Sequence, residues 1–190
     1  MNSKIMRSAE GIVGAAISII CVLLVIQNNQ LKKQLELTGY SGNIVEPLQP
    51  GDDARPIQCL EIDGKQSTIT YTDDYEQYLL FVFSTKCPHC EKSLPNIERI
   101  ADEVVDSPVD LVGVSMHDLD ETQKWVIDKR VNFRVIAVTD STFEQRYKIS
   151  GVPTVILINR KGVVQNVWVG EVVGDRLDEV LNSLSIHRSS

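Results

Sequence analysis

The sequence predicts an α/β domain with a central mixed β-sheet, flanking helices and a β-hairpin at its start, preceded by a single transmembrane helix. Three observations support this fold class. Strand-like apolar runs alternate with amphipathic helix patterns from about residue 50 to residue 184, a strand–turn–strand pattern stands near the end, and an uncharged stretch lies close to the amino terminus. Alternating strands and helices are typical of a sheet with parallel strands, to which the late hairpin adds antiparallel ones.

The composition is that of a globular chain with one domain of ordinary size. The chain has 190 residues, of which 43% are hydrophobic and 24% are charged, and its formal net charge is −7. About 140 residues remain for the domain once the amino-terminal segments are set aside, which is enough for a real hydrophobic core. The acidic balance argues against nucleic acid as a partner, because a phosphate backbone is bound by a basic surface.

The amino-terminal segment has the pattern of an uncleaved signal anchor. Lys4 and Arg7 precede the sixteen uncharged residues 11–26, a run slightly shorter than the roughly 20 residues that a spanning helix uses. Because no small-x-small cleavage site follows, we expect an anchor, with a cleaved signal peptide as the alternative. The predicted organisation is a cytoplasmic segment (1–10), a transmembrane signal anchor (11–27), a polar linker (28–50), the folded domain (51–186) and a tail (187–190).

The first half of the domain has the pattern of a hairpin followed by a buried strand. Residues 57–62 alternate in part and end at Asp63-Gly64, a turn signal, before a second strand at 68–71. Residues 78–83 form a continuous apolar run, as expected of a strand buried on both faces of a sheet.

The remaining elements follow from the spacing of apolar side chains. Helices are predicted where apolar residues recur at three- and four-residue steps, and strands where they run together between turn residues. The predicted helices cover residues 88–106, 119–131, 143–149 and 175–184, and the predicted strands cover 109–116, 133–138, 155–159 and 163–169.

Cys87 and Cys90 follow the buried strand at the start of the first predicted helix. Their spacing places both sulfur atoms on one side of the first helical turn, where they can close a disulfide. The free backbone N–H groups and the positive end of the helix dipole favour a thiolate at Cys87. Pro88 suits the first turn because its missing N–H would have no helical partner there. Lys86 and protonated His89 add positive charge that favours the thiolate further.

Structural thiols and half of a zinc site are the other interpretations of this pair. A zinc site needs further ligands, and the chain offers only Cys21, Cys59 and three histidines, none with the required spacing. We therefore predict a redox-active dithiol with no metal and no organic cofactor. Cys59 is expected to be a buried strand thiol, with a third redox partner as the alternative. His117 is expected to be a surface-loop histidine, with the alternative that it follows a strand end that faces the site.

Residues 50–184 resemble the thioredoxin superfamily, most closely its membrane-tethered TlpA/ResA-like branch. The motifs that carry the resemblance are Asp63-Gly64-Lys65, Cys87-Pro88-His89-Cys90 and Gly151-Val152-Pro153-Thr154 before the final hairpin. The resemblance implies a thioredoxin-like fold in which Cys87 is the attacking thiolate and Cys90 the resolving one. It also implies a cis bond before Pro153, beside the dithiol, with the peptide groups of Val152 free to pair with a substrate chain.

Several positions depart from the family pattern. Phe81 stands six residues before Cys87, where thioredoxins carry a buried aspartate, and Ser93 stands where ResA-like reductases carry a glutamate. Lys86 replaces the usual tryptophan before the first cysteine. The Pro-His dipeptide between the cysteines is the one seen in DsbA-like oxidases, and stabilising the thiolate favours the reduced form, so His89 argues for an oxidising or intermediate potential.

These features predict a membrane-anchored thiol-disulfide oxidoreductase on the extracytoplasmic (periplasmic) side of the cell membrane, where disulfides persist. Its expected partners are protein disulfide or dithiol substrates and a redox protein that supplies or accepts electrons, and residues 11–27 would contact the membrane. One alternative is a thiol-dependent peroxidase, because Ser84, three residues before Cys87, loosely matches a Ser/Thr-x-x-Cys site. Another is a redox-inactive binding or chaperone module. The direction of electron flow is left open.

Overall fold

The computed structural model describes residues 20–27, 30, 47–72 and 74–185 of the chain. Residues 20–27 are helical. No helix within the described residues is both long enough and apolar enough to cross a membrane. Residues 11–19 of the predicted signal anchor, most of the predicted linker and the predicted tail lie outside the described residues, so the anchor stays a prediction.

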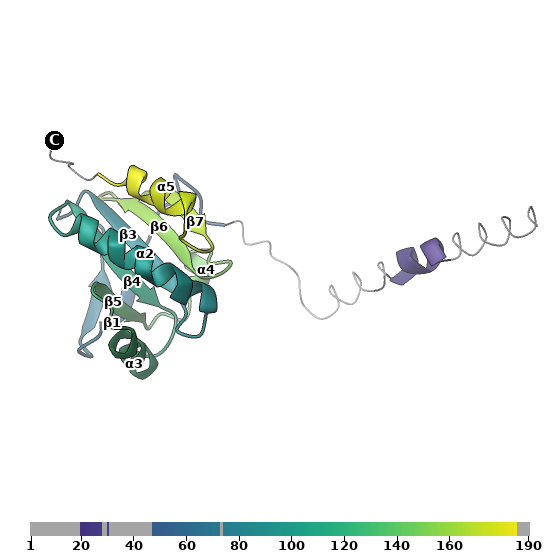
Figure 1. Cartoon of the computed structure of the whole chain (residues 1–190), viewed down its shortest axis with the longest axis horizontal. Helices are drawn as coiled ribbons and strands as arrows, with labels where there is room; N and C mark the ends of the chain where they lie inside the picture. Colours follow the sequence, from purple (N-terminus) through teal and green to yellow (C-terminus); the bar gives the residue numbers. More distant parts are fainter. Residues whose placement is uncertain (1–19, 28–29, 31–46, 73, 186–190) are drawn as a thin grey trace, which may run out of the picture. The chain divides into compact units, whose positions relative to one another are not determined.

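The domain is built on a mixed sheet with helices on both faces (Figure 1). In chain order its elements are β1 (Ile57–Glu61), β2 (Gln66–Ile69), β3 (Gln77–Phe83), α2 (Pro88–Val104), β4 (Val109–Ser115), α3 (Leu119–Lys129), β5 (Arg134–Val138), α4 (Phe143–Arg146), β6 (Thr154–Asn159), β7 (Val164–Val169) and α5 (Asp175–Ser183). Within the described residues the sheet has seven strands in the order β2-β1-β5-β4-β3-β6-β7. Strands β3, β4 and β5 are parallel, and the other neighbouring pairs are antiparallel, which confirms the predicted mixed sheet.

Strand β3 lies at the centre of the sheet, and all 7 of its residues are buried. It pairs in parallel with β4 and antiparallel with β6, so Phe81 faces Gly113 on one side and Val155 on the other. Because both faces of the strand are covered, its sequence is a continuous apolar run rather than an alternating one. The prediction of a strand buried on both faces is confirmed.

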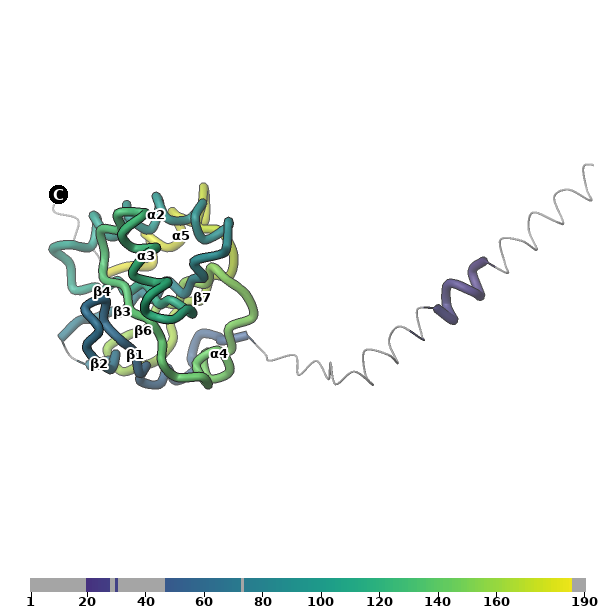
Figure 2. Tube along the Cα trace, turned by 90° about the horizontal axis from the view of Figure 1, so that it is seen from below, coloured from purple at the N-terminus to yellow at the C-terminus, as the bar shows by residue number. Residues whose placement is uncertain are grey.

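Two hydrophobic cores lie on opposite faces of the sheet, because successive residues of β3 point to opposite sides. Phe81 and Phe83 face the core that α2, α3 and α5 cover. Leu80 and Val82 face the core that α4 and the segment around Leu48 cover. Figure 2 shows α2, α3 and α5 together on one side of the strands, with α4 on the other. Leu48 belongs to the predicted linker, so residues just before position 51 contribute to the core.

The predicted amino-terminal β-hairpin is formed by β1 and β2. Gly64 lies in its turn with a φ of 84°, a conformation that glycine adopts without steric cost. Strand β1 also pairs antiparallel with β5, where Cys59 lies opposite Val138. This long-range pairing joins the hairpin to the rest of the sheet.

Helices α3 and α4 end earlier than the apolar spacing predicts. Helix α3 ends at Lys129 rather than at residue 131, because Arg130 adopts a left-handed conformation (φ 54°) and its N–H caps the last turn. Helix α4 ends at Arg146, and Lys148 is also left-handed (φ 48°). Since neither of these left-handed residues is glycine, the usual sequence signal for a helix end is missing.

The carboxyl ends of β3 and β4 and the amino end of β6 meet at one edge of the sheet. Phe83 pairs with Ser115, the last residue of β4, and Val82 pairs with Thr154, the first residue of β6. The loops that follow β3 and β4 therefore converge with the loop that precedes β6. These loops carry the cysteine pair and the predicted cis-proline.

Candidate active site

The cysteine pair lies between the end of β3 and the first turn of α2. Cys87 is the residue just before the helix and is half-buried, whereas Cys90 is fully buried. Both are free thiols, and their side chains are in hydrogen-bond contact. The N–H of Cys90 donates to the carbonyl oxygen of Cys87 at 3.0 Å. The thiol that another protein can reach is therefore Cys87.

Cys90 is held as a neutral thiol. The pKa of Cys90 is raised to about 12, chiefly by burial; a hydrogen bond from the Ser84 main chain opposes the rise, and the neighbouring Cys87 adds to it. The carbonyl oxygen of Ser84 accepts the N–H of Cys87 at 3.2 Å, so the main chain of this one residue contacts both cysteines. A buried, protonated thiol suits the resolving role that the family resemblance implies for Cys90.

The Val152–Pro153 peptide bond is cis, as the resemblance implies. The thiol of Cys87 lies 3.5 Å from the carbonyl oxygen of Val152 and is oriented to donate to it. On the other side of this loop, the N–H of Gly170 donates to the carbonyl oxygen of Pro153 at 2.8 Å. The structure thus brings together Cys87, Cys90, Val152 and Pro153, while the substrate-binding role of the last two stays a prediction.

Glu171, which sequence reasoning did not single out, lies beside the Pro-His dipeptide. Nδ1 of His89 donates to its carboxylate, and Nζ of Lys92 lies 3.2 Å from the same Oε1 atom. The hydrogen bond from His89, followed by that from Lys92, lowers the pKa of Glu171. His89 therefore contacts a carboxylate as well as lying between the two cysteines in the sequence. The role assigned to His89 in tuning the thiolate stays a prediction.

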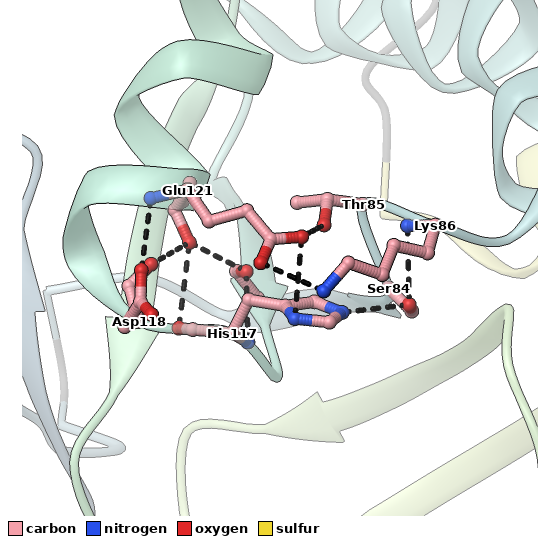
Figure 3. A network of polar contacts seen from close by, with 8 residues as sticks. Ser84, Thr85, Lys86, His117, Asp118 and Glu121 are labelled. Carbon is pink, nitrogen blue, oxygen red and sulfur yellow. Dashed lines mark hydrogen bonds and ion pairs between the residues drawn. The ribbon is translucent and has the colours of Figure 1, made fainter.

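A second polar network joins the loop before Cys87 to the start of α3 (Figure 3). Oγ of Ser84 lies 2.8 Å from Nε2 of His117, and Nδ1 of His117 lies 3.4 Å from Oε1 of Glu121. Nζ of Lys86 donates to Oε2 of Glu121 at 3.0 Å, and the Thr85 hydroxyl donates to the same carboxylate. The bond from Thr85, and then that from Lys86, lowers the pKa of Glu121. The network ties Lys86 and the Thr85 hydroxyl to α3, and the Ser84 hydroxyl to His117 just before that helix.

The position of Glu121 follows from the way α3 begins. Asp118 caps the helix, its Oδ1 accepting the N–H of Glu121 at 2.9 Å. This cap fixes the first turn, and Figure 3 shows the Glu121 side chain reaching from that turn toward Thr85 and Lys86. Because the carboxylate neutralises Lys86, the predicted contribution of Lys86 to a Cys87 thiolate is opposed by this ion pair.

His117 lies in the loop after β4, as expected, but its side chain belongs to the site rather than to the open surface. Its side chain is 21% exposed, and it bonds to Ser84, three residues before Cys87. The physical reason is the parallel pairing of β3 and β4, which places the loops that follow the two strands side by side. The available signal was the position of His117 directly after the predicted strand 109–116, whose end could face the site.

Cys59 is buried in β1, as expected, and it faces the second core rather than the dithiol. Its thiol lies 3.5 Å from the carbonyl oxygen of Ser67, and burial raises its pKa. Within the residues that the structure describes, no group of three or more His, Cys, Asp and Glu side chains is arranged to hold a metal ion.

A Cys-x-x-Cys pair at the amino end of a helix, following the central strand and lying against a cis-proline on this sheet, defines the thioredoxin-like class of proteins. The comparison with known families agrees. The model of the AhpC/TSA family matches residues 50–167, and the chain belongs to this family.

Curated relatives and solved structures are similar to this chain over most of the domain. Sporulation thiol-disulfide oxidoreductase A of Bacillus subtilis is 25% identical over 122 residues, which are 62% of this chain and 73% of the relative. Thiol-disulfide oxidoreductase ResA of Halalkalibacterium halodurans is 23% identical over 132 residues, 69% of this chain and 74% of the relative. The thioredoxin domain of a Bacteroides vulgatus thiol-disulfide oxidoreductase superimposes with a TM-score of 0.61 at 19% identity, covering 71% of this chain and 96% of that structure. This last likeness shows the fold.

Proposed function

We propose that this protein is a thiol-disulfide oxidoreductase that exchanges electrons with cysteines of other proteins through Cys87 and Cys90. The observation that carries the proposal is the asymmetry of the pair: a reachable thiol at a helix start lies beside a buried thiol whose pKa is raised to about 12. Two such thiols divide the work of disulfide exchange between an attacking and a resolving group. The names of the relatives, which are thiol-disulfide oxidoreductases, support this function.

The proposed reaction balances as two successive exchanges. The Cys87 thiolate attacks one sulfur of a substrate disulfide, breaks the S–S bond and releases the first substrate thiolate. Cys90 then loses its proton and attacks Cys87, which forms the Cys87–Cys90 disulfide and releases the second substrate thiolate. The substrate gains two electrons, the dithiol loses them, and the thiolates take up protons from Cys90 and from solvent. The same steps in reverse oxidise a substrate dithiol.

The order of these steps follows from the two environments. The main-chain hydrogen bond from Ser84 to the Cys90 sulfur favours its thiolate once the proton has left, while burial keeps the proton in place beforehand. A substrate chain would approach Cys87 along Val152, whose carbonyl oxygen already lies 3.5 Å from the Cys87 sulfur. We expect a redox protein to regenerate the pair by the same route.

The equilibrium between the Cys87/Cys90 dithiol and glutathione tests the proposal. Incubation of the purified protein in buffers of graded glutathione potential, followed by alkylation and mass spectrometry, should show one two-electron transition of this pair. Replacing His89 with alanine removes a positive charge that favours the thiolate, so His89→Ala should make the pair more reducing, by about 30 mV for a tenfold change in the equilibrium constant. An equal or higher potential in His89→Ala would contradict the role given to His89, and absence of a transition would contradict the function.

We further propose that residues 11–27 anchor the protein in the cell membrane and that the domain acts on the extracytoplasmic side. The supporting features are the uncharged stretch behind Lys4 and Arg7 and the dithiol itself, which suits a compartment where disulfides form. The full-length protein should stay in the membrane pellet after alkaline extraction, while a form lacking residues 1–27 should not. Release of the full-length protein by the same extraction would contradict the anchor.

The peroxidase alternative receives less support from the geometry. The Ser84 hydroxyl contacts His117, and the Thr85 hydroxyl donates to Glu121, so both are engaged away from the Cys87 sulfur. A dithiol exchange also explains the neutral Cys90 beside Cys87, which a single peroxidatic thiol does not need. Peroxide consumption that survives the loss of Cys90 would favour the peroxidase.

A further inference from the structure

We propose that Glu171 is a positioning residue of the dithiol site, which sets the reduction potential of the Cys87/Cys90 pair through its contact with His89. The proposal rests on the proposed function, because a potential has meaning only for a pair that exchanges electrons. It assigns a role to a residue 81 positions beyond Cys90 in the sequence, brought to the site by the fold.

The carboxylate of Glu171 contacts the side chains of His89 and Lys92 at the start of α2. Nδ1 of His89, inside the Cys-x-x-Cys motif, donates to it, and Nζ of Lys92 lies 3.2 Å from Oε1. Glu171 is partly shielded, with its side chain 27% exposed, so its field is screened less than that of a fully exposed group. The histidine inside the motif is thus hydrogen-bonded to a carboxylate rather than solvated alone.

The loop that carries Glu171 is fastened to the site on both sides. The N–H of Val172 donates to the buried Oγ of Ser93 at 3.0 Å, and Nδ2 of Asn96 donates to the carbonyl oxygen of Val172 at 2.8 Å. On the other flank, the N–H of Gly170 donates to the carbonyl oxygen of Pro153 at 2.8 Å. These bonds hold the Glu171 backbone between the helix of the dithiol and the cis-proline, so its position does not depend on the ion pair alone.

The carboxylate reaches the site from a different element than in the resembling families. Phe81 and Ser93 occupy the two positions where thioredoxins and ResA-like reductases carry an acidic residue. Here Ser93 instead anchors the loop, through the bond from Val172, and the adjacent residue of that loop supplies the acid. The carboxylate at this site is therefore that of Glu171, and it contacts His89 inside the Cys-x-x-Cys motif.

The sign of the effect follows from charge. Removing the carboxylate takes one negative charge from the site. The electrostatic potential at Cys87 becomes more positive, which favours the thiolate and hence the reduced form. His89 also loses the acceptor that fixes its ring. Loss of Glu171 should therefore make the pair more oxidising, the opposite of the effect of losing His89.

The test is the glutathione equilibrium of the full chain with Glu171→Gln. We expect the equilibrium constant to shift about tenfold toward the dithiol, which corresponds to about 30 mV. The matched control is Glu103→Gln, the same change of charge at an exposed position near the far end of α2, which should keep the wild-type potential. In the His89→Ala background the shift produced by Glu171→Gln should differ from the shift in the wild type, because the two side chains are in contact and their effects on the potential are coupled.

Three results would overturn the inference: no shift in Glu171→Gln, an equal shift in Glu103→Gln, or a Glu171→Gln shift that is the same whether residue 89 is histidine or alanine. Glu171→Asp keeps the charge but shortens its reach, so it should give a smaller shift of the same sign, and it carries the test if the glutamine variant does not fold. A wild-type protein that forms no Cys87–Cys90 disulfide in any buffer would contradict the proposed function itself. A Cys87/Cys90 redox transition whose potential does not change when Glu171 is replaced would contradict only this inference.

Discussion

Cys87→Ser is expected to reduce the exchange of electrons with protein disulfides to the uncatalysed background. The hydroxyl that replaces the thiol is not a nucleophile toward sulfur at neutral pH, and the remaining thiol, Cys90, is buried and neutral. The measurement is the reduction rate of a model protein disulfide, with Cys59→Ser as the matched control. Cys59 is buried in the core on the opposite face of the sheet from the dithiol, so its loss should leave the rate close to that of the wild type.

The companion variant Cys90→Ala separates attack from resolution. Cys87 can still attack, but nothing inside the protein can release the bound chain, so mixed disulfides with protein substrates should accumulate and disappear on addition of a reductant. Substrate turnover that persists when both Cys87 and Cys90 are serine would contradict the proposed chemistry and would favour the redox-inactive binding module.

Phe81→Ala is expected to lower the free energy of unfolding by about 3–5 kcal/mol, because it opens a cavity at the centre of the domain. Phe81 is fully buried in β3. Its ring stacks on Phe83 with centroids 5.4 Å apart and meets Phe133 in an edge-on arrangement with centroids 6.5 Å apart. The strand is hydrogen-bonded on both sides, so the surrounding backbone has little freedom to close the gap.

Denaturant unfolding followed by circular dichroism measures this loss. The control is Val105→Ala, at a site just beyond α2 where the side chain is 75% exposed, and we expect it to change the stability by no more than about 0.5 kcal/mol. A Phe81→Ala protein within about 1 kcal/mol of the wild type would mean that the site relaxes far more than a packed core does.

The local parts of this fold could be predicted from the sequence, and the long-range parts could not. The apolar run of β3 and the motif around Cys87 are signals between neighbouring residues, and both identify what the structure contains. The pairing of β1 with β5 has no such signal, because it depends on which strand edge remains open after the others have paired. Likewise, α3 is capped by a left-handed arginine, Arg130, where a glycine would have been the sequence signal for a helix end.

The candidate site divides in the same way. The cysteines, the cis-proline and the dipeptide between the cysteines were identified from their motifs. The two carboxylates that contact the charged residues of the motif were not, because Glu121 lies 35 positions from Lys86 and Glu171 lies 82 positions from His89. The residues around Glu121 and Glu171 do not distinguish either of them from a solvated acid. The parallel pairing of β3 with β4 brings Glu121 to the site, and the return of the chain through β7 brings Glu171.

The burial of Cys90 has a consequence for the order of events in a catalytic cycle. Since a second protein cannot touch that sulfur, electrons enter and leave through one reachable atom, the sulfur of the half-buried Cys87. Donor and acceptor must therefore dock in turn on the same face, and each must depart before the other arrives. The electron donor and the electron acceptor should therefore carry similar docking surfaces, although they never bind each other.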